Sequence, residues 1–287
     1  MQLDEFLKQV CPQLELDWRK YRRASQRKVM ARIRELGLQG LEEYARYIQD
    51  HPREGQEVLP NVLRVTVSRF FREQQIWDHL AGYVLPSIVS LVGASRPVRI
   101  LSIGCCNGEE PYSAALTWKW GMGDRPDIPK PHITALDVDP SCLGRARMGL
   151  YTAKTLREVP PHLRSKWFAP ETSGYRLDPG IRNMVSFVHR DILQDPLPEA
   201  QDIIFCRYLV FTYFHGRRRR LMLEKILNSL APHGYVILGR KEGLHPDDEA
   251  FLQPVSGMPG LYISSPLIHS GEPQPPGRCP NRSACGR

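Results

Sequence analysis

The stretch SIGCCNGEEPYS, near the middle of the chain, carries glycines and acidic residues in a pattern that suits a small-molecule site. It joins an apolar run at 98–103 to a segment with helical spacing, so it predicts a strand, a tight turn and a helix. A first turn of this kind needs glycine where the backbone approaches a ligand closely, and Gly104 and Gly108 are placed for that role. The two glycines could also do no more than shape the turn.

The charge of this turn indicates which ligand it suits. A dinucleotide-binding turn has the spacing G-x-G-x-x-G, which is absent here, and the helix after it receives a pyrophosphate. In this chain Glu109 and Glu110 open the helix, where a pyrophosphate would need positive charge. Acidic residues at this place favour a cofactor with positive groups, such as a sulfonium and an ammonium.

Further acidic residues stand where later strands are expected to end. The predicted strand 132–138 ends in ALDVD, and a carboxylate there can accept two hydrogen bonds from a ribose diol. We expect Asp137 to be that carboxylate and Asp139 to be the N-cap of the next helix. After the following strand, Asp191 is placed to reach an adenine amino group, with Ile192 beside the ring face.

These residues belong to a region in which strands and helices alternate. The spacing predicts strands at 98–103, 132–138, 185–189, 202–206, 235–238 and 260–264, and helices at 109–120, 140–148 and about 217–230. Such alternation argues for a doubly wound α/β fold, a mostly parallel sheet with helices on both faces. The polar stretch 152–182 holds four prolines and is expected to be an insertion or subdomain.

The residues before this region have the apolar spacing of four or five short helices, from residue 3 to about residue 80. Between Trp18 and Arg34 they include eight basic residues and no acidic one: Arg19, Lys20, Arg22, Arg23, Arg27, Lys28, Arg32 and Arg34. A run of charges can be no more than a solvated face. Because acidic residues are missing at the i+3 and i+4 positions, however, we expect this basic segment (19–34) to make no internal ion pairs and to face a partner. We divide the chain into a helical domain (1–82), an α/β domain (83–265) and a tail (266–287) too poor in apolar residues to fold.

The composition excludes several classes of protein. An apolar content of 41% in 287 residues is enough for one large α/β core and a small appendage. No apolar run of about 18 residues and no signal peptide is present, so we expect a cytoplasmic protein without membrane insertion. The seven cysteines have no disulfide or zinc spacing, and a metal site at His269, Cys279 and Cys285 is not expected. The net charge of +8 implies an acidic partner, either nucleic acid or protein.

Four strings together resemble the CheR-type chemoreceptor glutamate methyltransferases, which use S-adenosyl-L-methionine. GCCNGEEPYS is similar to the family's GCSTGEEPYS, with Cys106 and Asn107 in place of Ser and Thr. ALDVDPSCLGRARMGLY resembles its second-strand segment, TVSRFFRE (66–73) a motif at the end of its helical domain, and FCRYLVFTYF its FCRNVLIYF. The agreement runs in order from about residue 3 to residue 263. It implies a Rossmann-like class I methyltransferase domain with a seven-stranded sheet after a small helical domain.

The resemblance also implies roles for particular residues. The cofactor pocket would be lined by Thr66, Ser68, Arg72, Gly104, Gly108, Glu110, Asp137, Asp191, Ile192, Tyr208 and Leu209. Glu110 would contact the methionine portion of the cofactor, Asp137 the ribose, and Asp191 with Ile192 the adenine. Arg72 and Tyr213 would be catalytic, since an arginine can hold one oxygen of an acceptor carboxylate while the other attacks.

Two departures from the family pattern bear on activity. Tyr208 stands where the family has asparagine, and CRYLVFTYF is one residue longer than CRNVLIYF. An insertion directly after a buried strand can displace Tyr213. A binding module that holds S-adenosylmethionine or its product without catalysis is therefore a second hypothesis.

The main hypothesis is methyl transfer to glutamate side chains of a chemoreceptor-like protein, giving methyl esters. A glutamate carboxylate is ionised at neutral pH, so the reaction needs no general base, and no metal is required. The basic segment would dock on an acidic helical receptor signalling domain. A nucleic-acid methyltransferase would fit the same charge. However, no Asn-Pro-Pro-Tyr-like motif lies near Cys206, which argues against base amino groups as acceptors.

Overall fold

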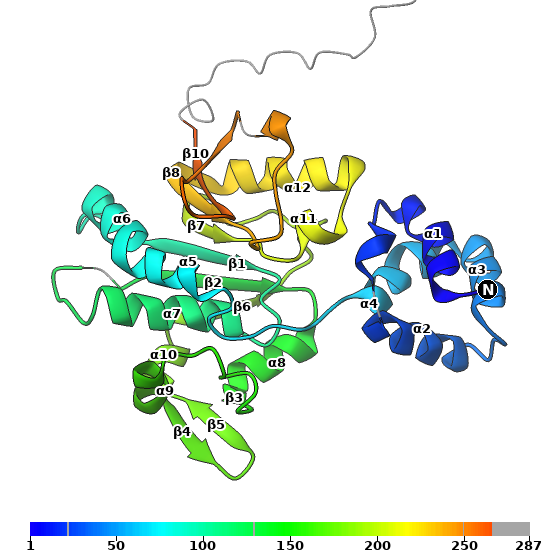
Figure 1. Ribbon diagram of the computed structural model, residues 1–287, viewed down its shortest axis with the longest axis horizontal. Helices are drawn as coiled ribbons and strands as arrows, with labels where there is room; N and C mark the ends of the chain where they lie inside the picture. Colours follow the sequence, from blue (N-terminus) through cyan, green and yellow to red (C-terminus); the bar gives the residue numbers. More distant parts are fainter. Residues whose placement is uncertain (22, 129, 249, 266–287) are drawn as a thin grey trace, which may run out of the picture.

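The computed structural model describes residues 1–265 except residues 22, 129 and 249. The chain forms a helical domain, an α/β domain and a small three-stranded sheet that projects from the α/β domain (Figure 1). None of the helices in the described residues is long and apolar enough to cross a membrane. The expected tail, with His269, Cys279 and Cys285, lies outside the described residues.

The helical domain has the short helices that the apolar spacing predicts. They are α1 (Leu3–Val10), α2 (Arg23–Glu35), α3 (Leu41–Asp50) and α4 (Leu59–Leu63), with single turns η1 (Pro12–Leu14), η2 (Trp18–Lys20) and η3 (Glu54–Val58). The apolar faces of these helices meet in one core, where Phe6 stacks on Tyr44 with ring centroids 5.5 Å apart. This core is separate from the two cores that flank the sheet.

The basic segment is less uniform than its sequence suggests. It is divided between η2 and α2, and Arg22 lies outside the described residues. The expectation that it makes no internal ion pairs is wrong for Arg32, which contacts Glu35 at 3.2 Å and the buried Glu54 at 2.8 Å. Arg19 is also paired, with Asp17 at 2.8 Å. Glu35 lies one residue beyond the basic segment at the i+3 position, and Glu54 comes from η3. Arg32 therefore stabilises the domain rather than facing a partner.

An extended linker, residues 64–69, carries the chain from α4 to the sheet. It is followed by α5 (Gln74–His79), η4 (Leu80–Val84) and α6 (Leu85–Val92), which run on from one another across residue 82. Trp77 of α5 is fully buried and stacks on Phe205 of the sheet, with ring centroids 5.3 Å apart. Because these helices share the core of the sheet, we place the domain boundary in the linker rather than at residue 82.

The sheet has seven strands in the order β6-β2-β1-β7-β8-β10-β9. Their bounds are β1 (Arg99–Ile103), β2 (His132–Asp137), β6 (Val185–His189), β7 (Gln201–Phe205), β8 (Leu230–Ile237), β9 (Leu252–Pro254) and β10 (Leu261–Ser264). The first five strands in this order are parallel, whereas β10 is antiparallel to both neighbours. The predicted doubly wound, mostly parallel sheet is confirmed, although β8 begins at Leu230 rather than at 235.

Helices cover both faces of this sheet (Figure 1). They include α7 (Glu109–Gly121), α8 (Pro140–Met148) and α12 (Gly216–Ser229). Alternate side chains of β1 pack into the cores on the two faces of the sheet. Ile100 packs on the face covered by α5 to α7, and Leu101 on the face covered by α12. The strand order reverses between β1 and β7, and in open α/β sheets ligands bind beyond the carboxyl ends of the strands at such a point.

The polar stretch 152–182 contributes most of a separate subdomain. Strands β3 (Leu150–Tyr151), β4 (Phe168–Glu171) and β5 (Gly174–Leu177) form an antiparallel sheet in the order β3-β5-β4, flanked by α9 (Pro161–Trp167) and α10 (Pro179–Arg182). The insertion was expected from the sequence, but its sheet was not. Strands of two to four residues are too short to show a period in the sequence.

Candidate active site

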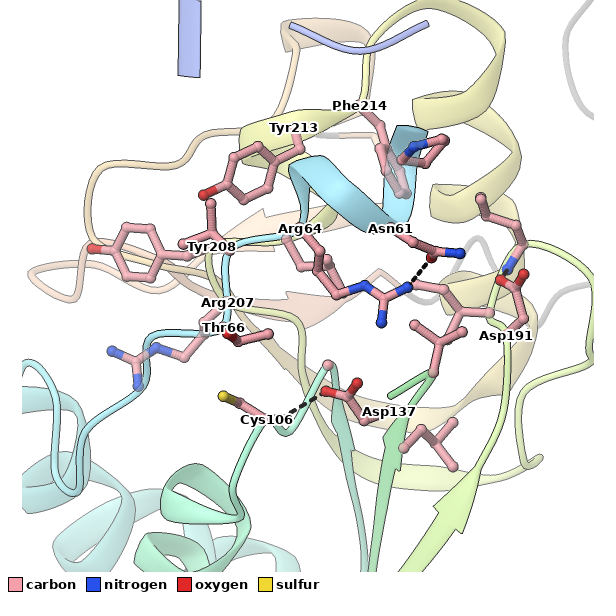
Figure 2. Close-up of a pocket in the computed structure, with 18 of the residues that line it drawn as sticks. Asn61, Arg64, Thr66, Cys106, Asp137, Asp191, Arg207, Tyr208, Tyr213 and Phe214 are labelled. Carbon is pink, nitrogen blue, oxygen red and sulfur yellow. Dashed lines mark hydrogen bonds between the residues drawn. The ribbon is translucent and has the colours of Figure 1, made fainter. Parts of the chain in front are cut away.

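A cavity of about 620 Å³ lies at the point where the strand order reverses. Its walls come from α4, the linker, and the segments that follow β1, β2, β6 and β7. Figure 2 shows Asp137 and Cys106 at the base of the view, Asp191 to one side, and Tyr208 and Tyr213 to the other. Of the residues proposed from the sequence, the structure brings these into the lining: Thr66, Ser68, Arg72, Gly104, Glu110, Asp137, Asp191, Ile192, Tyr208, Leu209 and Tyr213.

Gly108 is the exception, since it does not line the cavity. It is the N-cap of α7 with φ +87°, and a Cβ on it would lie 3.0 Å from Ala146, Phe187 and Tyr112. It therefore allows α7 to pack closely on α8 and β6. Gly104 is the glycine that faces the cavity: its φ is +74°, and a Cβ there would come within 2.7 Å of Leu209.

Asp137 shapes the turn after β1 as well as lining the cavity. Its Oδ2 accepts a 2.8 Å hydrogen bond from the Cys106 amide, and its Oδ1 accepts one of 2.9 Å from the Asp139 amide. Burial raises the pKa of Asp137, although these two amides and the charge of Arg64 oppose the rise. Each carboxylate oxygen keeps a second lone pair for a ligand. Asp139 is the N-cap of α8, as predicted, and accepts from the Ser141 amide at 2.9 Å.

Glu110 contributes a second carboxylate near the carboxyl end of β1. Its Oε1 accepts a 2.9 Å hydrogen bond from Ser102, and its Oε2 lies 3.6 Å from Nη1 of Arg207. Burial raises the pKa of Glu110, because the charge of Arg207 and the Ser102 hydrogen bond do not fully compensate for the loss of water. A positively charged ligand would supply the missing compensation.

We expect this carboxylate to make the affinity for a cationic ligand depend on pH. Above its raised pKa Glu110 is charged and attracts a cation, whereas below it the attraction is lost, so the affinity should fall as the pH falls. The decline should begin above the ordinary glutamate pKa of about 4.3. Titration calorimetry between about pH 5 and pH 8 measures it. Glu110→Gln should bind more weakly at neutral pH and show a flatter profile; an unchanged profile would assign the dependence to Asp137 instead.

Arg72 lies between the linker and α5, and it lines the cavity. Its guanidinium carbon lies 3.7 Å from the ring centroid of Tyr208, and its carbonyl accepts hydrogen bonds from Trp77 (3.0 Å) and Arg207 (2.8 Å). The next residue, Glu73, accepts from the Tyr208 hydroxyl and, at 2.7 Å, from Arg207. Burial disfavours the charge on Glu73, but these two donors outweigh it and hold the pKa of Glu73 below its usual value.

Strained backbone is concentrated around the cavity. Among the described residues, seven that are not glycine have a positive φ, and four of them, Phe71, Glu73, Cys106 and Tyr208, lie in or beside segments that line it. Each such residue costs on the order of 1–3 kcal/mol and persists only where surrounding contacts hold it. Concentrated strain of this kind is typical of functional sites.

Tyr213 lines the cavity although the chain carries an extra residue after β7. The segment between them makes a left-handed turn at Tyr208, with φ +54°, and continues as the single-turn helix α11 (Val210–Tyr213). The helical domain then holds this segment: the Asp17 amide donates to the Tyr213 carbonyl at 2.8 Å, and the ring of Tyr21 lies 5.2 Å from that of Tyr213.

The side of the cavity beyond β6 presents Asp191 and Ile192. Asp191 Oδ1 accepts from the Leu193 amide at 2.9 Å, which fixes the carboxylate in the loop, while Ile192 is 9% exposed and offers an apolar surface. An apolar face beside a fixed hydrogen-bond acceptor suits a planar ring that carries an amino group.

Several residues of the site were not singled out in the sequence, namely Asn61, Arg64, Glu73, Arg207 and Glu242. Glu73 and Arg207 stand inside the quoted strings TVSRFFRE and FCRYLVFTYF, and a charge directly after an apolar run was the available signal. Asn61 and Arg64 carry no such signal, because polar residues near the end of a short helix are ordinary surface residues.

The cysteines in the part of the chain that the structure describes are buried, although Cys106 also lines the cavity. All five described cysteines are buried, and no cluster of His, Cys, Asp and Glu could hold a metal ion there. Burial raises the pKa of Cys105 well above that of a free thiol. This agrees with a packing role for Cys105.

Comparisons with known proteins agree with this geometry. Residues 66–258 match the family model described as "CheR methyltransferase, SAM binding domain". A probable chemotaxis protein methyltransferase of Rhizobium etli is 31% identical over 217 residues, which cover 73% of this chain and 80% of that protein. A chemotaxis protein methyltransferase of Listeria monocytogenes is 31% identical over 189 residues, 66% of this chain and 70% of that protein. The "Chemotaxis protein methyltransferase 2" of Pseudomonas aeruginosa is 31% identical over 217 residues, 74% of this chain and 75% of that protein. The chain therefore belongs to the CheR family of S-adenosylmethionine-dependent methyltransferases.

Proposed function

We propose that this chain transfers a methyl group from S-adenosylmethionine to glutamate side chains of a chemoreceptor and so forms glutamate methyl esters. The observation that carries the proposal is that Arg72 and Tyr213 line the same cavity as Glu110, Asp137 and Asp191. A receptor signalling domain as acceptor would place the reaction in the cytoplasm.

The residues present fit the cofactor. When bound, S-adenosylmethionine supplies an electrophilic methyl group on a positively charged sulfur. Asp137 would accept from the ribose hydroxyls through its unused lone pairs, Asp191 from the adenine amino group, and Glu110 from the ammonium of the methionine portion. Gly104 has no side chain, which allows Leu209 to pack directly on its backbone in the wall of the cavity.

The chemistry asks little of the protein beyond alignment and exclusion of water. Arg72 would hold one oxygen of the acceptor carboxylate by charge-assisted hydrogen bonds, with the Tyr213 hydroxyl as a second donor. The other oxygen is then free to attack. The linker contributes Thr66 and Ser68 to the wall of the cavity and so helps to keep water from the reacting atoms.

A direct test is to incubate the chain with labelled S-adenosylmethionine and receptor fragments, and to assay for base-labile methyl esters. Labelled esters that depend on the receptor's glutamates would support the proposal. Cofactor binding by calorimetry without any transfer would favour a module that only binds. The position of Tyr213 argues against that alternative, since the insertion has not removed this residue from the cavity.

The exposed part of the basic segment is the proposed docking surface for an acidic helical receptor domain. Arg27, Met30 and Arg34 are exposed at the i, i+3 and i+7 positions of α2, and therefore lie on one face of the helix. Cations on both sides of an apolar residue suit a helix whose surface is acidic. Lys28 lies beside this face, but its ammonium donates to the Arg64 carbonyl at 2.6 Å.

Reversing these charges should weaken docking but leave the cofactor site intact. We expect Arg27→Glu with Arg34→Glu to raise the receptor-fragment Kd about tenfold or more at low salt, and less at high salt. Surface plasmon resonance at two ionic strengths measures it, with the exposed Arg125→Glu as a matched control. Cofactor affinity should not change. If receptor binding stayed intact while salt-sensitive RNA binding was lost, the face would belong to a nucleic acid instead.

A further inference from the structure

Tyr208, the residue that departs from the family motif, lies against the guanidinium of Arg72. The Arg72 Cζ is 3.7 Å from the centre of the tyrosine ring, which is close contact between a cation and an aromatic face. We infer that Tyr208 is a positioning residue that holds Arg72 ready for the acceptor carboxylate. The inference rests on the proposed function, because it concerns the same transfer reaction.

A ring face restrains an arginine in a way that preserves its donors. A carboxylate partner would occupy the guanidinium N–H groups and neutralise the charge, whereas stacking uses neither. Among the described residues, no hydrogen bond or ion pair of the Arg72 side chain to another residue is found. As far as the described part of the chain shows, its guanidinium N–H donors can therefore serve an incoming carboxylate.

The ring that supports Arg72 is itself fixed from several sides. The Tyr208 hydroxyl donates to Glu73, and its backbone amide donates to the buried carboxylate of Glu242 at 2.6 Å. Gly239 lies directly against the ring, where a Cβ would come within 2.5–2.8 Å of three ring atoms. The lack of a side chain at Gly239 thus provides the space that the tyrosine ring fills.

The backbone of Arg72 is held by a second, separate contact. Arg207 donates to the Arg72 carbonyl at 2.8 Å and to Glu73 at 2.7 Å, while the Arg240 amide donates to Glu73 at 3.0 Å. Main chain and side chain of Arg72 are therefore anchored through Glu73 and its partners. The asparagine of the family motif has no ring face, so in this chain the departure supplies a support that asparagine could not.

The test separates support of Arg72 from binding of the cofactor. Tyr208→Leu should lower kcat for methyl transfer about tenfold, because the cation loses its ring, whereas Tyr208→Phe, which keeps the ring, should retain most of the turnover. Because Tyr208 also lines the cavity, calorimetry should find the Kd for S-adenosylhomocysteine raised in Tyr208→Leu, but by much less than the roughly tenfold loss of turnover. The exposed Tyr83→Leu is the matched control.

A second variant reaches the same contact without changing the tyrosine. Gly239→Ala should displace the ring and lower kcat in the wild-type background, but have little further effect in the Tyr208→Leu background. Wild-type turnover in Tyr208→Leu, additive effects in this cycle, or a rise in the S-adenosylhomocysteine Kd equal to the loss of turnover would each overturn the inference. By contrast, a wild-type chain that methylates no receptor glutamate would contradict the proposed function itself.

Discussion

Arg72→Ala should lower methyl transfer by about two to three orders of magnitude, the usual loss when one fixed donor to a reacting oxygen is removed. The side chain ends in the cavity and rests on Tyr208, and no described hydrogen bond of the fold depends on its guanidinium. Turnover with a receptor fragment measures the loss, and the melting temperature of the variant should stay close to that of the wild type.

Arg72→Lys refines this prediction. Lysine keeps the positive charge but lacks the planar fork that pairs with a carboxylate, so the variant should recover only a small part of the activity. The exposed Arg125→Ala serves as the control for loss of an arginine, since its partner Asp127 is also at the surface. Unchanged turnover in Arg72→Ala would remove this residue from the mechanism.

Asp137→Ala should raise the Kd for S-adenosylmethionine about tenfold to a hundredfold, because an ionised acceptor for the ribose is lost. The same change leaves the Cys106 and Asp139 amides without their acceptor, so the free energy of unfolding should also fall by about 1–3 kcal/mol. Calorimetry gives the first quantity and urea unfolding the second.

Asp139→Ala is a matched control for this site. It removes the N-cap of α8, which should lower the free energy of unfolding by about 1 kcal/mol, but the Asp139 amide that donates to Asp137 remains. Cofactor affinity should therefore be retained. If both variants lost affinity equally, the effect would come from a disturbed turn and not from a ribose contact.

The two departures from the family motif are better understood from the structure than from the sequence. Read along the chain, Tyr208 and the extra residue before Tyr213 suggest a damaged site. In space, Tyr213 still lines the cavity, and the ring of Tyr208 contacts Arg72, which is far away in the sequence. Glu73 and Gly239, which lie outside the string FCRYLVFTYF, accommodate Tyr208: Glu73 accepts a hydrogen bond from its hydroxyl, and Gly239 leaves space for its ring.

The sequence alone determined the parts of this protein that depend on neighbouring residues. Apolar period and turn chemistry predict the helical domain, the parallel strands, the Gly104 turn and the Asp139 cap, because the backbone hydrogen bonds of these elements are local or follow from strand order. Of the site residues that the family strings implied, all except Gly108 line the cavity. The periodic pattern and the family strings both depend on residue types at short, regular spacing.

Only the tertiary structure decided which distant side chains meet. It placed Gly108 in a packing contact, tied Arg32 to Glu54, packed Trp77 of α5 against the sheet, and brought Arg72 onto the ring of Tyr208. Such contacts join elements separated by tens of residues or more, and they form because apolar burial brings the elements together. No periodic pattern in the chain records which polar groups will then lie within hydrogen-bonding or stacking distance.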